Sequence, residues 1–354
     1  MITFRPRSFS KEDMFSAVEA MSYPYAFSGL KRRELEDFFC EYTKRRYALA
    51  VRDLILPLLT LLRYAGVSNG SKVLISPLSF HKHFSPYIRF IGACPLYPDA
   101  ERWFLNIDTK RLSNVMSEDI KVIIGSNSLG NPMDWDALKE LVNGKGILLI
   151  EDSRETLFSE YKGKPAGSFG HVSFLEFSES SVLMGYGGIV LTDDRLIYER
   201  LKESSALLDD IMSSVIFSQV KQLDDTIAIR GDLANLYSRY LLAIEGIKAQ
   251  YPPKYVTKMC WSYFSVHFGK RYSKDARGLI KNLMYDDGIE VLEYPISQDI
   301  LEGKKLEHLH IAHEVSTRAL LLPLHQDMEE DDVYFVCERL KEHAVQIGAG
   351  SVDH

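Results

Sequence analysis

Short apolar runs alternate with longer segments of helical periodicity along most of this chain. The strand-like runs lie at residues 47–51, 73–76, 121–125 and 147–150. Between and around them, apolar residues at helical spacing predict helices at residues 12–23, 30–46, 54–66, 134–142 and 195–204. Strands that alternate with helices in this way predict an α/β fold with a mostly parallel central sheet, flanked by helices on both faces.

The pattern changes beyond residue 242. There the apolar runs predict a strand at residues 259–268 and helices at residues 273–289 and 329–343, followed by a small, polar tail at 345–354 that we expect to fray. We therefore predict two domains. Residues 1–242 form a large domain, and residues 243–354 form a smaller α+β domain.

Composition narrows the class of protein. The chain has 354 residues, of which 46% are hydrophobic, so it can bury a sizeable core. Its formal net charge is −7 and it has no long basic run, which argues against nucleic acid as a partner. The four cysteines lie far apart without metal-binding spacing, and no apolar run is long enough to cross a membrane. A cytoplasmic location is expected.

The stretch from Gly146 to Asp194 carries the candidate chemistry. A buried strand ends on the acidic pair Glu151 and Asp152, at the edge where open α/β sheets bind ligands, and a glycine cluster at residues 185–188 precedes another apolar run. This order resembles the signature segment of the DegT/DnrJ/StrS family. Those proteins are nucleotide-sugar aminotransferases that use pyridoxal phosphate (PLP) on the fold type I scaffold, and the resemblance covers roughly residues 25–345.

The resemblance implies a role for several side chains in cofactor binding. It places Asp152 against the pyridine nitrogen of PLP, Asn127 near the ring hydroxyl and His81 where an aromatic residue stacks on the ring. Glu155 stands where the family usually has a histidine or glutamine. Two carboxylates in one pocket raise at least one pKa, and such a pair can be functional. The alternative, which we favour, is a salt bridge to Arg154 or Lys162.

The position of the family's cofactor-binding lysine is occupied by a serine. Counting back from Gly185, that lysine falls on Ser180, and no lysine occurs between Lys164 and Lys202. Transamination needs a primary amine to hold the cofactor and to move a proton. A serine hydroxyl can do neither, so no catalytic residue is assigned.

The phosphate-binding elements of the family are also replaced. The expected Gly-Thr or Gly-Ser pair falls on Leu54 and Ile55, while Asp53 is a candidate N-cap that would put a negative charge at the helix end a phosphate would use. The segment 204–208 lacks the asparagine and arginine that reach the neighbouring subunit's phosphate. His81 and His83 have no further ligands at metal-binding spacing, so no metal site is expected.

Three functions remain open. The first is a sugar aminotransferase-like protein that has lost transaminase competence and binds a nucleotide sugar or a partner as a homodimer. The second is an enzyme that acts on a nucleotide-linked keto-sugar with noncovalently held PLP or PMP, as in relatives that dehydrate sugars with histidine in place of lysine. Its proton carriers would be His81, Glu155, Glu179 or His171. The third is a non-catalytic subunit of an active aminotransferase paralogue.

Overall fold

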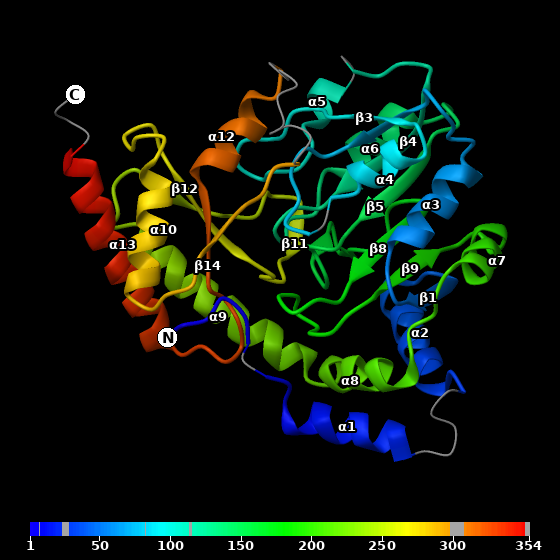
Figure 1. Ribbon diagram of the computed structural model, residues 1–354, viewed down its shortest axis with the longest axis horizontal. Helices are drawn as coiled ribbons and strands as arrows, with labels where there is room; N and C mark the ends of the chain where they lie inside the picture. The colour runs from blue at the N-terminus through cyan, green and yellow to red at the C-terminus, as the bar shows by residue number, and fades with distance from the viewer. Residues whose placement is uncertain (7, 23–27, 82, 113–114, 298–307, 351–354) are drawn as a thin grey trace.

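The computed structural model describes residues 1–6, 8–22, 28–81, 83–112, 115–297 and 308–350, and for residues 349 and 350 the backbone alone. Its centre is a seven-stranded sheet (Figure 1). Across the sheet the strands are β1 (Tyr47–Val51), β9 (Gly188–Thr192), β8 (Val172–Glu176), β5 (Leu148–Asp152), β4 (Ile120–Ser126), β2 (Lys72–Ile75) and β3 (Cys94–Leu96).

Parallel pairing dominates this sheet. The neighbours from β3 to β8 all pair in parallel, whereas β9 is antiparallel to both β8 and β1. Both faces are covered by helices. These are α2 (Leu30–Thr43), α3 (Ile55–Tyr64), α4 (Ser85–Phe90), α5 (Thr109–Leu112), α6 (Trp135–Val142), α7 (Arg195–Ser204) and α8 (Asp210–Val220), while α1 (Lys11–Ser22) packs on α8. The predicted α/β fold with a mostly parallel sheet is confirmed.

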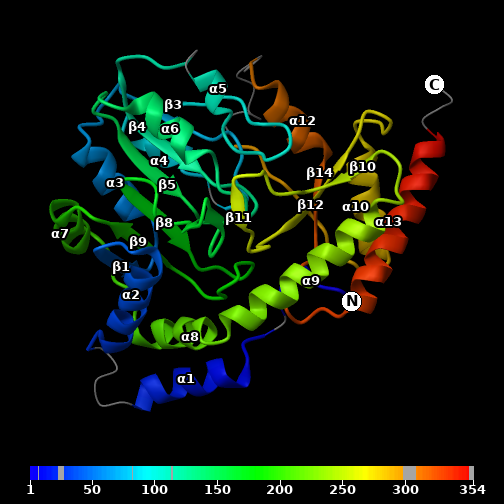
Figure 2. The same ribbon diagram turned by 180° about the vertical axis from the view of Figure 1, so that it is seen from behind.

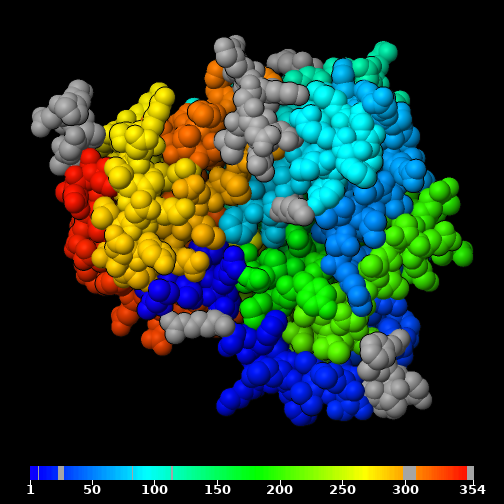
Figure 3. Space-filling model, viewed as in Figure 1, coloured from blue at the N-terminus to red at the C-terminus, as the bar shows by residue number. Residues whose placement is uncertain are grey.

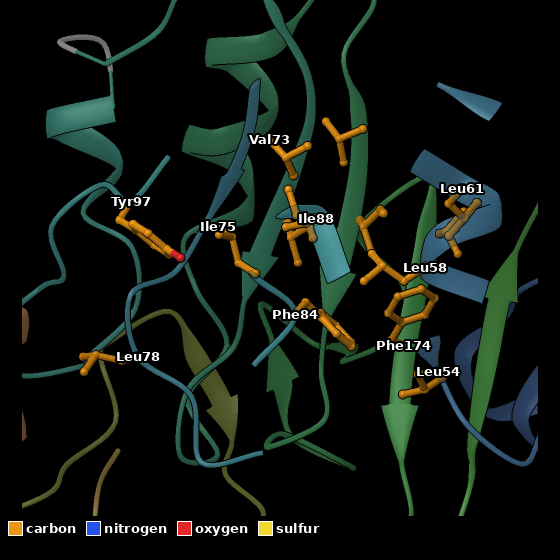
Figure 4. Close-up of a cluster of buried hydrophobic side chains, with 14 of the residues drawn as sticks. Leu54, Leu58, Leu61, Val73, Ile75, Leu78, Phe84, Ile88, Tyr97 and Phe174 are labelled. Atoms are coloured by element: carbon orange, nitrogen blue, oxygen red, sulfur yellow. The ribbon is translucent and has the colours of Figure 1, made fainter. Parts of the chain in front are cut away.

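Alternate side chains of the strands enter separate cores. Val73 and Ile75 of β2 join a large cluster beneath α3 and α4, which Figure 4 shows together with Leu58 and Phe84. Leu74, between them, packs on the other face with α6. Burial of both faces explains why these strands are continuously apolar in the sequence.

A second sheet is built from later residues. Its strands lie in the order β10 (Ile247–Ala249), β12 (Phe264–Phe268), β14 (Ala319–Leu322) and β13 (Leu292–Glu293). It is accompanied by α10 (Ala276–Asp286), α12 (His310–Arg318) and α13 (Glu330–Gly350). The long helix α9 (Leu223–Leu241) runs from α8 toward this sheet, as Figure 2 shows from behind. The exact domain boundary at residue 242 stays a prediction.

Some predicted boundaries differ from the structure. Strand β5 continues through Glu151 and Asp152 because both pair with β4 and β8. The strand predicted at 259–268 is confined to β12, and the tail does not fray before residue 350, since α13 continues to Gly350. Residues 351–354 and Tyr23 lie outside the described residues. A further three-stranded sheet joins β6 (Glu160–Tyr161), β7 (Lys164–Pro165) and β11 (Val256–Lys258).

Among the described residues, no helix combines the length and the apolar character needed to cross a lipid bilayer.

Candidate functional site

The ends of β1 and β8 and the loop that joins β8 to β9 line an open cavity of about 580 Å³. It brings together three segments that the sequence predicts to meet, namely the start of α3, the residues before α4 and the loop that carries Ser180. The described residues that line it are Arg5, Arg52, Asp53, Phe80, His81, Glu176, Phe177, Ser178, Glu179, Ser180, Gly185, Tyr186 and Gly187. None of them is a lysine.

Ser180 lies at the wall of this cavity. Its hydroxyl is 3.5 Å from the hydroxyl of Tyr263, a residue that comes from the segment before β12. Tyr263 is itself buried, and burial raises the pKa of its phenol well above the ordinary value. The only hydrogen-bond partner of the Ser180 hydroxyl among the described residues is therefore a neutral phenol, which is not a base that could form an alkoxide.

His81 forms a charged pair with Glu176 at the back of the cavity. Nδ1 of His81 is 3.0 Å from Oε2 of Glu176, and Nε2 is 3.3 Å from the Tyr263 hydroxyl. Burial acts to lower the pKa of His81, but the Glu176 carboxylate outweighs it and the pKa is raised. Burial likewise opposes ionisation of Glu176, whereas His81 and Arg154 lower its pKa to about 2. The pair is therefore ionic over the acidic and near-neutral range.

Asp152 is fully engaged by Arg154. Nε of Arg154 donates to Oδ1 at 2.8 Å and Nη2 donates to Oδ2 at 2.9 Å, and both side chains are less than one-tenth exposed, at 3% and 7%. The sequence resemblance placed this carboxylate against a pyridine nitrogen. In the structure a guanidinium stands in front of it.

Asp53 takes the role of helix cap that the sequence predicts. Its Oδ1 accepts hydrogen bonds from the backbone N–H groups of Ile55 at 2.8 Å and Leu56 at 3.2 Å. A carboxylate thus occupies the positive end of α3, where a phosphate would need those same N–H groups.

Glu155 is held by neutral donors behind the cavity. It accepts hydrogen bonds from the backbone N–H groups of Phe80 at 2.5 Å and Leu129 at 2.9 Å, and from the Tyr294 hydroxyl at 3.1 Å. Burial is the main cause of the raised pKa of Glu155, and the like charge of Asp152, which the sequence predicts as the cause, contributes less. The predicted salt bridge with Lys162 is wrong, because the Lys162 amine is 2.6 Å from the Asp136 carboxylate instead.

Asn127 is buried in a different hydrogen-bond network. Its amide donates to the Ser153 hydroxyl at 2.7 Å and to Glu151 at 3.2 Å, and its Oδ1 accepts from Met133 N and Trp135 Nε1. These four hydrogen bonds all connect Asn127 to other residues of the fold, and Asn127 is not among the residues that line the cavity.

Two of the predicted proton carriers are separated by the fold. Glu179 lies at the mouth of the cavity, where it pairs with Arg5. His171 instead lines a second, larger cavity of about 840 Å³ at the other end of β8, together with Arg45 and Lys139. That cavity contains none of the predicted cofactor residues, so its size does not make it the candidate site.

These residues do not fit a PLP or PMP group. The carboxylate that would face the ring nitrogen already accepts two N–H groups from Arg154, and the helix end that would bind phosphate is capped by Asp53. Ser180 offers no amine. The site as built therefore does not support chemistry through such a cofactor.

Sequence reasoning missed two members of the site. Glu176 ends β8 much as Asp152 ends β5, and a carboxylate at a strand end was the available signal. Tyr263 gave no signal, because it precedes β12 and only the packing of the second sheet brings it to Ser180.

Comparison with known proteins agrees with this architecture. Residues 9–206 and 204–341 match the model of the DegT/DnrJ/EryC1/StrS aminotransferase family. The chain is 23% identical over 331 residues to the GDP-perosamine synthase of Escherichia coli O157:H7, covering 88% of this chain and 89% of that protein. It is also 29% identical over 176 residues to the GDP-4-keto-6-deoxy-D-mannose 3-dehydratase of Yersinia pseudotuberculosis, covering 48% and 44% of the two chains.

Solved structures show the same fold. The putative sugar aminotransferase of Streptococcus pneumoniae in its PMP form superposes with a TM-score of 0.90 at 19% identity, covering 98% of this chain and 100% of that one. PseC of Helicobacter pylori, an aminotransferase involved in the biosynthesis of pseudoaminic acid, superposes with a TM-score of 0.88 at 20% identity, covering 98% and 99%.

Proposed function

This chain belongs to the DegT/DnrJ/EryC1/StrS aminotransferase family, and we propose that it is a cytoplasmic member that does not transaminate. The observation that carries the proposal is the cavity beside Ser180. A hydroxyl stands where the resemblance places the cofactor's lysine, and no amine is found among the described residues that line the cavity. A protein of this kind would retain the family's scaffold for binding.

The test is covalent capture of PLP. Purified protein is incubated with PLP and reduced with borohydride, and its intact mass is then measured. We expect no stoichiometric pyridoxyl adduct and no absorption of a lysine-bound cofactor. An adduct in full yield at one defined lysine, mapped by peptide mass spectrometry, would overturn the proposal. Scattered, partial labelling of surface lysines would not.

We propose that the ligand of the cavity is a nucleotide-linked sugar. Family membership supports this class of ligand, as do the two arginines, Arg5 and Arg52, which line the cavity and could meet a diphosphate. Binding of GDP-mannose, measured by calorimetry, should weaken at least about ten-fold in Arg52→Gln, because one charge-assisted contact is lost. The exposed Arg195→Gln, which removes the same charge on α7, is the matched control. Equal binding by both variants would contradict this assignment.

A second candidate function, as a subunit of an assembly, is favoured by helix α1. Met14, Phe15, Val18 and Met21 are each more than half exposed, with 54% as the lowest value, and they follow helical spacing. In Figure 3 this helix stands at the lower edge of the molecule. We propose that the stripe is covered in a homodimer, since monomeric proteins rarely leave such a patch open.

Sedimentation velocity tests the assembly. The wild type should sediment as a dimer, and Phe15→Glu should shift it toward monomer. A wild type that is monomeric alone, but co-purifies with a lysine-bearing relative, would support a partner subunit instead of a homodimer.

A further inference from the structure

The guanidinium of Arg154 lies at the junction of the groups that the sequence assigned to cofactor binding. It makes two parallel hydrogen bonds with Asp152, at 2.8 and 2.9 Å, and its Nη1 is 3.6 Å from Oε2 of Glu176. Glu176 also holds His81. One planar cation therefore connects the carboxylate predicted to face a pyridine nitrogen with the acid that orients the predicted stacking residue.

The face of the guanidinium is covered by an aromatic ring. The central carbon of the Arg154 guanidinium lies 3.9 Å from the centroid of the Phe84 ring. Phe84 in turn packs edge-to-face on Phe174, with ring centroids 5.9 Å apart, within the cluster drawn in Figure 4. Because the core fixes Phe84, this stacking surface is rigid, and a desolvated cation gains from it.

A guanidinium in this position offers what a pyridinium ring would offer. It is planar and positively charged, it donates N–H to a carboxylate, and it stacks on an aromatic face. We infer that the side chain of Arg154 fills the space in which a pyridine ring would meet Asp152, so that the protein excludes PLP, PMP and related rings even as noncovalent ligands. This goes beyond the proposed function, which concerns the missing amine, since a ring held without a covalent bond needs no lysine.

The electrostatics of the cluster favour retention of Arg154 over exchange for a ligand. Burial acts to lower the pKa of Arg154, but Asp152 and Glu176, which both lie close to the guanidinium, outweigh burial and raise it. An incoming ring would have to expel a buried charge and leave it without a partner. Such a replacement is unfavourable unless the arginine finds an equivalent partner elsewhere.

The test uses pyridoxamine, which carries the ring and the amine but lacks the phosphate. The capped end of α3 therefore does not enter the measurement, and no Schiff base with the protein is possible. Binding is followed by ligand-observed NMR at millimolar concentration on the wild type, on Arg154→Ala and on the double variant Arg154→Ala with Asp152→Asn. Circular dichroism confirms that each is folded.

We expect no saturable binding to the wild type and at least ten-fold tighter binding to Arg154→Ala. The double variant should lose this gain, because the neutral amide of residue 152 no longer attracts the ring nitrogen. Asp152→Asn also removes the buried charge that Arg154→Ala leaves unpaired. Arg195→Ala, at an exposed position on α7, should behave as the wild type. If Arg154→Ala does not fold, Arg154→Gln serves in its place, since it keeps one hydrogen-bond donor for Asp152 in a shorter side chain.

Saturable binding to the wild type would overturn the inference, as would a folded Arg154 variant that binds no better than the wild type. Equal binding by the single and double variants would also overturn it, because the gain would then not depend on Asp152. These outcomes differ from failure of the proposed function. A wild type that binds pyridoxamine but forms no pyridoxyl adduct overturns only the inference, whereas a stoichiometric adduct overturns the proposed function.

Discussion

Glu151 and Asp152 are neighbours on β5, yet their carboxylates are stabilised by different kinds of group. Successive strand residues point to opposite faces of the sheet, so each carboxylate has its own surroundings. In the part of the chain that the structure describes, Glu151 accepts hydrogen bonds from neutral groups alone. Its donors are the backbone N–H groups of Gly167, Phe169 and Gly170, the hydroxyls of Ser153 and Ser173 and the amide of Asn127.

Asp152, in contrast, is neutralised by a single cation, Arg154, two residues further along the chain. The donors of Glu151 belong to the loop before β8 and to neighbouring strands, so its charge stabilises the architecture itself. The partner of Asp152 is one side chain, so a single substitution can remove it. The comparison teaches that one carboxylate of an acidic pair at a strand end can be held by the sheet's own hydrogen-bond network while its neighbour depends on one ion pair.

The largest effect is expected from Glu151→Ala. It leaves several buried N–H and O–H donors without an acceptor, and each such donor costs about 1–3 kcal/mol, so the free energy of unfolding should fall by about 4 kcal/mol or more. Urea denaturation measures the change. The control is Glu140→Ala on the exposed face of α6, which should stay within about 0.5 kcal/mol. A loss of only about 1 kcal/mol at Glu151 would show that water replaces the carboxylate.

The second largest loss of stability is expected from substitution of Arg154. Arg154→Met leaves Asp152 buried and unpaired, which should reduce the free energy of unfolding by about 3 kcal/mol. Adding Asp152→Asn should recover most of this loss, because the buried charge disappears. The two substitutions form a double-mutant cycle, and additive effects would mean that the pair is not coupled.

The His81–Glu176 pair predicts a pH dependence of stability. The folded pKa of Glu176 is lowered from 4.5 to about 2, so its contribution is present above about pH 4.5 and is lost as pH falls toward 2. The folded pKa of His81 is raised above 6.5, so its contribution is present below that pH and is lost as pH rises through the folded value. The pair should stabilise most between about pH 4.5 and 6.5.

Melting temperatures measured across this pH range test the pair. Glu176→Gln should destabilise by roughly 2 kcal/mol within the window, because a partly buried ion pair is lost, and by less outside it. The matched control is Glu179→Gln in the same region, whose carboxylate is exposed and pairs with Arg5 at the surface. It should give a small change without the same window. A Glu176→Gln difference independent of pH would contradict the ionic pair.

Local features of this fold could be predicted from the sequence, and contacts between distant segments could not. Strands such as β1 and the cap on α3 follow from residues adjacent in the chain, so the apolar pattern and Asp53 were enough. The Arg154 guanidinium could point to Glu155 or Asp152, and only the path of the chain after β5 decides between them. Tyr263 reaches Ser180 across 83 positions, which no local pattern records. Asn127 was placed at the cofactor by resemblance, but it lies in the network of Glu151.

The smallest change in stability is expected from substitution of Ser180. Its hydroxyl makes one contact of 3.5 Å, so Ser180→Ala should change the free energy of unfolding by no more than about 0.5 kcal/mol. Ser180→Lys supplies the amine that transamination requires, but it leaves Arg154 on Asp152 and the carboxylate of Asp53 on α3. The single variant should therefore still give no stoichiometric pyridoxyl adduct after PLP and borohydride, whereas Ser180→Lys with Arg154→Ala should give more adduct at residue 180. If Ser180→Lys alone captures PLP in full yield, one missing amine is enough to account for the proposed loss of transamination, and Arg154 is a structural partner of Asp152 that a cofactor readily displaces.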